Sequence, residues 1–245
     1  MPQSNADAQP TITELRRDLA AALRLSERMG FHEGICNHFS VVVPGNEERY
    51  LINSYGVHWS ETKPHDLLLI DGDGTVLEGD GEVEASARNI HIAGHRANPR
   101  HAAIMHVHMP HATALTMIEN GRLEMAHQTA CKFYSRMAYQ GFGGVALTAE
   151  QGEDIAKAQA DNPQADVIFL AAHGVSVGGP TIAIAFDDLY YLERACRQQI
   201  LAMSTGKPLA ILPDEKIIST HREMMQVLPY QAQKHFEALR RTIAA

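Results

Sequence analysis

Ala-Ala-Ile-Met-His-Val-His-Met-Pro-His, residues 102–111, is the most informative stretch of the chain, because three histidines follow directly on an apolar run. Alternate side chains of a strand share one face, so His106 and His108 are expected to project together from a strand over about 102–108. Two imidazoles placed in this way supply two neighbouring ligands for one divalent metal ion. The alternative is a pair of core histidines hydrogen-bonded to the backbone, and the motif alone does not decide between the two.

A second apolar run, residues 166–172, predicts a buried strand that ends at His173 and Gly174. The strand would deliver the imidazole at its end, and the glycine permits a close backbone approach. With His106 and His108 this would give three neutral ligands, which leave a metal ion its full charge and an open coordination position. That arrangement is typical of catalytic metal sites. Taken alone, His173 would more often cap a strand or bond a neighbouring carbonyl.

The remaining sequence predicts helices mixed with β-hairpins, which favours a mixed α/β layer over a purely parallel doubly wound sheet. Helices are expected over 11–29, 85–96, 149–160, 181–204 and most of 214–245, with a further helix opening at Pro110. Strands are expected at 39–43, 50–53, 67–70, 75–77 and 175–177. The predicted organisation is a disordered polar tail over 1–10, one domain over 11–210 and a C-terminal helical extension over 211–245.

Composition limits the possible partners. The 245 residues carry a net charge of −8, which argues against a nucleic-acid footprint or an anionic-membrane surface. The three cysteines are widely spaced, which suits a reducing compartment, and no stretch has the about 20 apolar residues of a spanning helix. The expectation is therefore a cytoplasmic protein that acts on a small molecule.

Several short motifs occur in a definite order. They are Ile35-Cys-Asn-His-Phe-Ser40, Tyr50-Leu-Ile-Asn-Ser-Tyr-Gly56, Asp66-Leu-Leu-Leu-Ile-Asp-Gly-Asp-Gly74, His91, the 106–111 histidines and His173-Gly174. In order and spacing, residues 14–205 resemble the class II aldolase/adducin family, and the first two motifs look closer to its adducin-like branch than to the sugar-phosphate aldolases.

The resemblance implies a single three-layer α/β/α domain around a mostly antiparallel sheet. It also implies a homotetramer with active sites at subunit interfaces. One divalent metal per subunit would be held by His106, His108 and His173, with zinc preferred over manganese, iron or cobalt. The metal would act as a Lewis acid.

The chain departs from the aldolase pattern at the catalytic base. A glutamate that binds metal and moves the proton in the aldolases is replaced by Ala87, and neither Glu82 nor Glu84 has the right spacing to substitute for it. The aldolase phosphate site is matched in part, with Ala85 in place of one serine. The candidate substrate-binding residues implied by the resemblance are Asn37, Ser54, Gly56 and Ser86.

The general acid is less well defined. The interface tyrosine of some aldolases falls at or next to Gln128, and the polar alternatives in that segment are His127, Lys132, Tyr134 and Tyr139. His111 is a candidate proton relay or a local helix-start residue. The candidate acids are therefore His111, His127 and Tyr134. His38 is expected to be exposed, and Trp59 is expected to pack in the core.

The leading hypothesis is a metal-dependent carbon–carbon lyase. Because Ala87 removes the aldolase base, decarboxylation or a related cleavage of a small hydroxy or keto acid is favoured over sugar-phosphate cleavage. The metal would stabilise the enolate left behind. The alternatives are a non-haem iron oxygenase with the same three histidines and a non-catalytic adducin-like binding module. Retention of all three histidines favours an enzyme.

Overall fold

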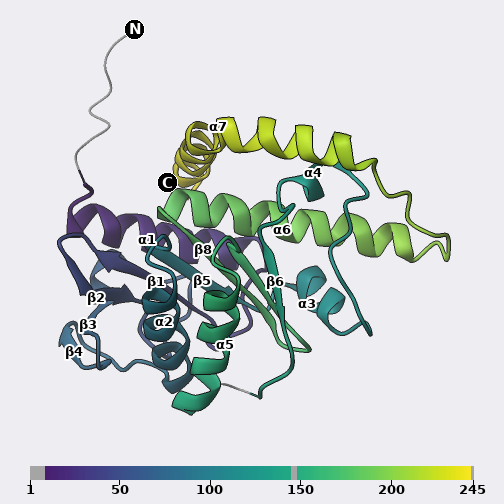
Figure 1. Ribbon diagram of the computed structural model, residues 1–245. Coiled ribbons are helices and arrows are strands. Elements are labelled where there is room, and N and C mark those ends of the chain that lie inside the picture. Colours follow the sequence, from purple (N-terminus) through teal and green to yellow (C-terminus); the bar gives the residue numbers. More distant parts are fainter. Residues whose placement is uncertain (1–8, 145–147, 244–245) are drawn as a thin grey trace, which may run out of the picture.

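The computed structural model describes residues 9–144 and 148–243, and its strands form one eight-stranded sheet (Figure 1). The strands are β1 (His38–Val43), β2 (Asn46–Ile52), β3 (Leu68–Asp71), β4 (Val76–Glu78), β5 (Ala103–Val107), β6 (Met137–Gln140), β7 (Val167–Leu170) and β8 (Gly174–Gly179). Their order is β4-β3-β2-β1-β5-β8-β7-β6. Only the β6–β7 pair of this sheet is parallel, so the expected mostly antiparallel sheet is confirmed.

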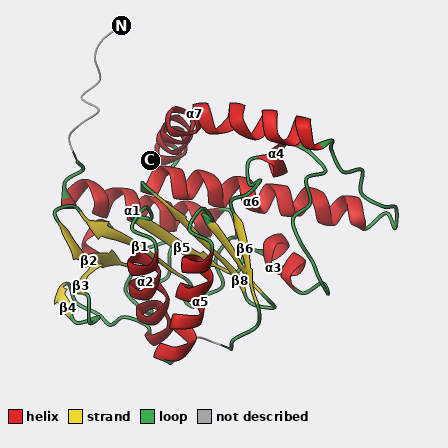
Figure 2. Ribbon diagram, viewed as in Figure 1, coloured by secondary structure: helices red, strands yellow, loops and turns green. Residues whose placement is uncertain are grey.

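Helices cover both faces of the sheet, as Figure 2 shows. They are α1 (Ile12–Arg28), α2 (Ala85–Ala97), α3 (Pro110–Thr116), α4 (Gln128–Cys131), α5 (Ala149–Asp161), α6 (Ile182–Met203) and α7 (Asp214–Arg241), with the 3₁₀ turn η1 (Pro64–Asp66). α1 and α6 lie on one face, α2 and α5 lie on the other, and α7 packs outside α6 (Figure 1). This is the expected three-layer α/β/α arrangement.

Local sequence accounts for the first helix. The Thr11 hydroxyl accepts a hydrogen bond from the Glu14 amide, and the Glu14 carboxylate accepts one from the Thr11 amide, so the N-terminus is closed by a capping box. Leu15, Leu19 and Leu23 follow at four-residue spacing and are buried. Burial of these three leucines packs α1 against the sheet.

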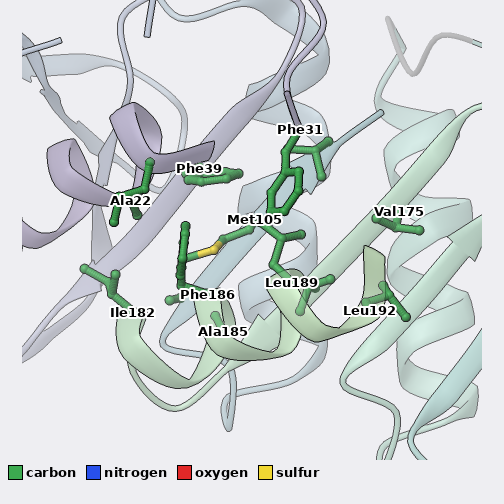
Figure 3. Packing of buried hydrophobic residues seen from close by; sticks show 14 of the residues in the cluster. Ala22, Phe31, Phe39, Met105, Val175, Ile182, Ala185, Phe186, Leu189 and Leu192 are labelled. Carbon is green, nitrogen blue, oxygen red and sulfur yellow. The ribbon is translucent and has the colours of Figure 1, made fainter. Parts of the chain in front are cut away.

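The core lies mainly between the sheet and the α1–α6 layer (Figure 3). In β5, Met105 and its alternate neighbours face this core, together with Phe39 of β1 and Phe186 of α6. His106 has the opposite parity in β5 and therefore faces α2. The alternation of one strand thus packs methionine into the core and delivers a histidine to the other face of the sheet.

The structure describes the predicted C-terminal extension but little of the predicted N-terminal tail. The expected tail over 1–10 falls mostly on residues 1–8, which lie outside the described residues. The expected C-terminal extension contains α7, which packs on α6 and α4. Across residues 9–144 and 148–243, no helix has both the length and the apolar character needed to cross a membrane.

Candidate metal centre

The three histidines named from the sequence converge in space. His106 belongs to β5, His108 follows that strand, and His173 lies in the turn between β7 and β8. Each offers a ring nitrogen within 4.8 Å of the other two. The centroid of the His173 ring lies 4.9 Å from that of His106 and 4.7 Å from that of His108. Pairing of β8 with β5 brings the distant third residue to the first two.

Hydrogen bonds determine which ring nitrogens are free. Nδ1 of His106 lies 3.0 Å from the carbonyl oxygen of Val175, and Nδ1 of His108 lies 2.5 Å from Oε2 of Glu33. A carbonyl or carboxylate only accepts, so both Nδ1 atoms carry the proton. In neutral rings both Nε2 atoms then hold a lone pair. This is how metal-binding histidines are oriented by their outer partners.

The spacing of the free nitrogens fits a divalent ion. Nε2 of His106 and Nε2 of His108 are 3.2 Å apart, and two unprotonated nitrogens at that distance have no hydrogen to share. Two nitrogens bound at about 2.0–2.1 Å to one tetrahedral zinc ion lie about 3.3–3.4 Å apart. The donor set and its spacing therefore fit one divalent metal.

Burial keeps the imidazoles of His106 and His173 neutral. It lowers the pKa of His173 to about 4, and it holds the pKa of His106 well below its usual value. Nearby imidazoles add to the effect, because each disfavours a positive charge on its neighbours. Neutral nitrogen is the form that binds metal.

Backbone features of the β7–β8 turn fix His173. Ala172 has φ of +51°, a left-handed conformation that non-glycine residues rarely adopt. A Cβ on Gly174 would lie 2.5 Å from the Val107 carbonyl oxygen and 2.8 Å from Cδ2 of His108. Glycine is thus required here for β8 to approach His108 closely. A cleft lined by residues that include Gln140, Gly141 and Leu170 reaches His173.

A buried polar layer lies behind the triad, on the α2 face of the sheet. His38 pairs with His106 across β1 and β5, and their rings stack with centroids 4.9 Å apart. Nδ1 of His38 lies 2.7 Å from Nε2 of His91, and Ser40 Oγ contacts both His91 and His95. His38 is only 2% exposed, so the expectation of an exposed side chain was wrong, and burial lowers its pKa to about 3.

The four candidate substrate residues come from the loop before β1, the loop after β2 and the first turn of α2. Asn37 Oδ1 accepts a hydrogen bond from the Glu33 amide, while its Nδ2 is buried without a partner. Ser54 lies beside the 79–82 turn, because a Cβ on Gly81 would meet Ser54 Oγ at 2.2 Å, and Gly56 follows it by two residues. Ser86 begins α2 and lies 3.3 Å from Nε2 of His38. The unpartnered amide and the Ser54 hydroxyl suit an anionic group, whereas the Ser86 hydroxyl already donates to Glu84.

Glu84 lies beside the polar layer behind the triad, and sequence reasoning assigned it little weight. Its Oε1 accepts a hydrogen bond from Ser86 Oγ at 2.8 Å, and its Oε2 lies 3.6 Å from Nε2 of His38. That second oxygen is buried without a hydrogen bond. Its spacing excluded it as a direct replacement for the aldolase glutamate. The signal that was available is its place three residues before Ala87, at the N-cap of α2.

The three candidate acids lie on or next to α3 and α4. Nδ1 of His111 lies 2.7 Å from Glu193 Oε1, and that carboxylate also accepts the first amides of α3. His127 caps α4, and Tyr134 lies against His221 of α7. Lys132 is buried in an ion pair with Asp187 and Asp188, which occupies its ammonium group. The α4 segment packs on α6 and α7.

Comparisons identify the family to which this fold and site belong. Residues 17–200 match the model of the Class II Aldolase and Adducin N-terminal domain. The chain therefore belongs to the class II aldolase/adducin family, as the motif order indicated. A crystal structure of an aldolase II superfamily protein from Pseudomonas syringae superposes with a TM-score of 0.88 at 31% identity, covering 97% of this chain and 94% of that one.

Relatives carry several different names. A putative aldolase class 2 protein from Caulobacter vibrioides is 32% identical over 82% of this chain and 77% of its own length. Decarboxylase NovR from Streptomyces niveus is 32% identical over 84% and 75%, respectively. The 4-hydroxy-3-prenylphenylpyruvate oxygenase/4-hydroxy-3-prenylbenzoate synthase from Streptomyces roseochromogenus subsp. oscitans is 30% identical over 76% and 67%. The family thus includes relatives named for aldolase, decarboxylase and oxygenase activities.

Proposed function

We propose that this protein is a divalent-metal-dependent carbon–carbon lyase acting on a small hydroxy or keto acid, by decarboxylation or a related cleavage. The observation that carries the proposal is the convergence of His106, His108 and His173, with two unprotonated Nε2 atoms 3.2 Å apart. Zinc suits this set best, and manganese, iron or cobalt are the alternatives. When bound, the ion would supply a Lewis acid that stabilises the negative charge developing as the carbon–carbon bond breaks.

The residues around the triad would position the substrate. The buried Nδ2 of Asn37 would donate to a carboxylate or phosphate oxygen, since a buried amide without a partner is costly. Ser54 and Gly56 would bind the same group, and Ser86 would join them on releasing the hydrogen bond that its hydroxyl donates to Glu84. The overall charge of −8 makes a local donor set of this kind necessary for an anion.

Proton transfer requires a replacement for the aldolase glutamate, because Ala87 has no ionisable group. We assign this role to Glu84, whose buried Oε2 has no hydrogen bond and faces His38 at 3.6 Å. His38 stacks on His106, so the pair reaches from the carboxylate to the metal centre. Glu84 would hold the proton, and His38 would orient the carboxylate.

A general acid from a neighbouring subunit completes the proposal. His127 and Tyr134 flank α4, which packs on α6 and α7 of its own chain. In a homotetramer with active sites at subunit interfaces, this segment would serve the site of an adjacent copy. The alternative acid within the same chain is His111, which follows His108 by three residues. Its Nδ1 contacts Glu193, so Nε2 is the nitrogen that could donate a proton.

The test is product release by metal-loaded protein from a panel of small hydroxy and keto acids. Carbon dioxide or aldehyde should appear, and the activity should disappear in His106→Ala and in a metal-free preparation. Failure to release either product from any acid in the panel would contradict the proposal, and it would favour a non-catalytic binding module.

The second candidate is an iron-dependent oxygenase that uses the same triad. The relative named for oxygenation of a prenylated phenylpyruvate is the observation that favours it. Three imidazoles can hold Fe(II) with open positions, although two histidines and a carboxylate are the more usual set. Product formation that requires both iron and oxygen would select this candidate, and undiminished turnover without oxygen would remove it.

A further inference from the structure

A second group of ligating side chains lies outside the triad. Glu27 occupies the last turn of α1, His32 lies in the turn that follows the helix, and His58 lies in the loop between β2 and η1. Each of the three offers one ligand atom, and these atoms lie within 4.8 Å of one another. All three residues are partly buried. Segments about 30 residues apart therefore bring two imidazoles and a carboxylate together.

The two imidazoles face each other through their Nε2 atoms. Nε2 of His32 and Nε2 of His58 are 3.3 Å apart, which matches the spacing of about 3.3–3.4 Å for two nitrogens on a tetrahedral zinc ion. Nδ1 of His58 lies 2.8 Å from Ser60 Oγ and also accepts a hydrogen bond from the Ser60 amide at 3.4 Å. Nδ1 of His32 is buried without a partner. A cation bound between the two Nε2 atoms therefore requires the His58 proton to lie on Nδ1, where Ser60 Oγ can accept it.

The geometry is held by the core rather than by flexible loops. The His32 ring stacks on Trp59, with centroids 5.6 Å apart and planes 27° apart. Trp59 is 1% exposed and packs against Phe39. The carboxylate of Glu27 lies at the C-terminal end of a helix, where the helix dipole favours positive charge.

We propose that Glu27, His32 and His58 form a second divalent-cation site, occupied by zinc. Two imidazole nitrogens and one carboxylate oxygen bind the ion, and water fills the remaining position. The cation joins the end of α1 to the loop after β2. It also holds the turn that carries Glu33, the residue after His32, whose carboxylate bonds to His108. The two centres are thus neighbours along the chain but have separate ligands.

Zinc stoichiometry tests this proposal without any assay of activity. Titration against a chromophoric chelator should show two zinc ions per chain in the wild type, and one in either His58→Phe or the double variant His106→Ala/His173→Ala. Combining these substitutions should abolish binding. His65→Phe is the control, because His65 is an exposed histidine of η1. An unchanged zinc content in His58→Phe would overturn the second site and leave the proposed lyase function untouched, since the triad is counted separately.

The single tryptophan supplies a second measurement. Trp59 is the only tryptophan of the chain, and it contacts His32. In the His106→Ala/His173→Ala background, Co²⁺ should quench its fluorescence with saturable one-site binding. His32→Phe keeps an aromatic ring on Trp59 and should remove the quenching, while Glu27→Gln should weaken Co²⁺ binding at least tenfold. Equal quenching in the His32→Phe variant and in its parent would refute the site, and near-wild-type emission before Co²⁺ addition shows that each variant has folded.

Discussion

Oε2 of Glu33 lies 2.5 Å from Nδ1 of His108, and this contact joins the turn after α1 to a ligand at the end of β5. The carboxylate fixes the tautomer that leaves Nε2 of His108 free to bind. Carboxylate partners of this kind are typical of metal-binding histidines. A residue 75 positions away in the sequence thus prepares one ligand of the proposed centre.

Removal of this charge should weaken metal binding. In Glu33→Gln the amide can present either its oxygen or its NH₂ group to Nδ1, so the tautomer is no longer fixed. Zinc affinity at the triad should fall by about 10–100-fold, the usual cost of losing such a partner. Competitive chelator titration measures the change. The control is Glu119→Gln, an exposed glutamate after α3, and equal affinities in the two variants would show that Glu33 does not position His108.

Position 174 should tolerate no side chain, because β8 approaches His108 closely there. Gly174→Ala places a Cβ 2.5 Å from the Val107 carbonyl oxygen, so β8 or His108 must move. We expect a loss of stability of about 1–3 kcal/mol, as for other overpacked sites, with weaker metal binding. Gly141→Ala is the control, because a Cβ there meets nothing within 4 Å. Thermal unfolding and metal titration indistinguishable from those of this control would contradict the inference.

The role of Glu84 as the proposed base can be tested separately from metal binding. Glu84→Gln should lower turnover by about 10²–10⁴-fold, the usual contribution of a positioned proton-transfer group. Metal content should stay at the wild-type value, because Glu84 touches Ser86 and His38 but no ligand of the triad. Glu82→Gln changes an exposed neighbour and should keep full activity. If Glu84→Gln lost its metal together with its activity, Glu84 would have a structural role and would not be the base.

Acid should destabilise the protein through its buried histidines. Burial lowers the pKa of His95 from 6.5 to about 4, so between these values the unfolded chain binds a proton that the folded chain does not. The free energy of unfolding therefore falls as the pH decreases from 6.5 to 4, by at most about 1.4 kcal/mol per pH unit for one such group. Urea unfolding of His95→Gln across this window should give a smaller slope than that of the exposed-site variant His65→Gln. Parallel slopes would contradict the assignment.

Sequence reasoning found the parts of the fold that follow local periodicity. The predicted 85–96 helix is α2, and the apolar runs before His106 and His173 are β5 and β7. α4 and β6 were not anticipated, because neither short segment carries an apolar run like those that mark β3 and β7. The alternation of side chains along a strand correctly predicted that His106 and His108 project to the same side of the sheet.

The polar layer behind the triad could not be read from the chain. His38, His91 and His95 are placed together by the β1–β5 register and by the packing of α2, and neither is encoded in a short motif. For the same reason His38 was interpreted as exposed. The partners of Glu33 and Glu84 depend on turns whose course only tertiary packing determines.

Anomalous diffraction from a zinc-loaded crystal, recorded at the zinc absorption edge, tests the central claim most directly. The account predicts a peak about 2.0–2.1 Å from one ring nitrogen each of His106, His108 and His173, with at least one position left for a small molecule. A fully zinc-loaded crystal with no peak among these three rings, or with a peak bound by only one of them, would contradict it.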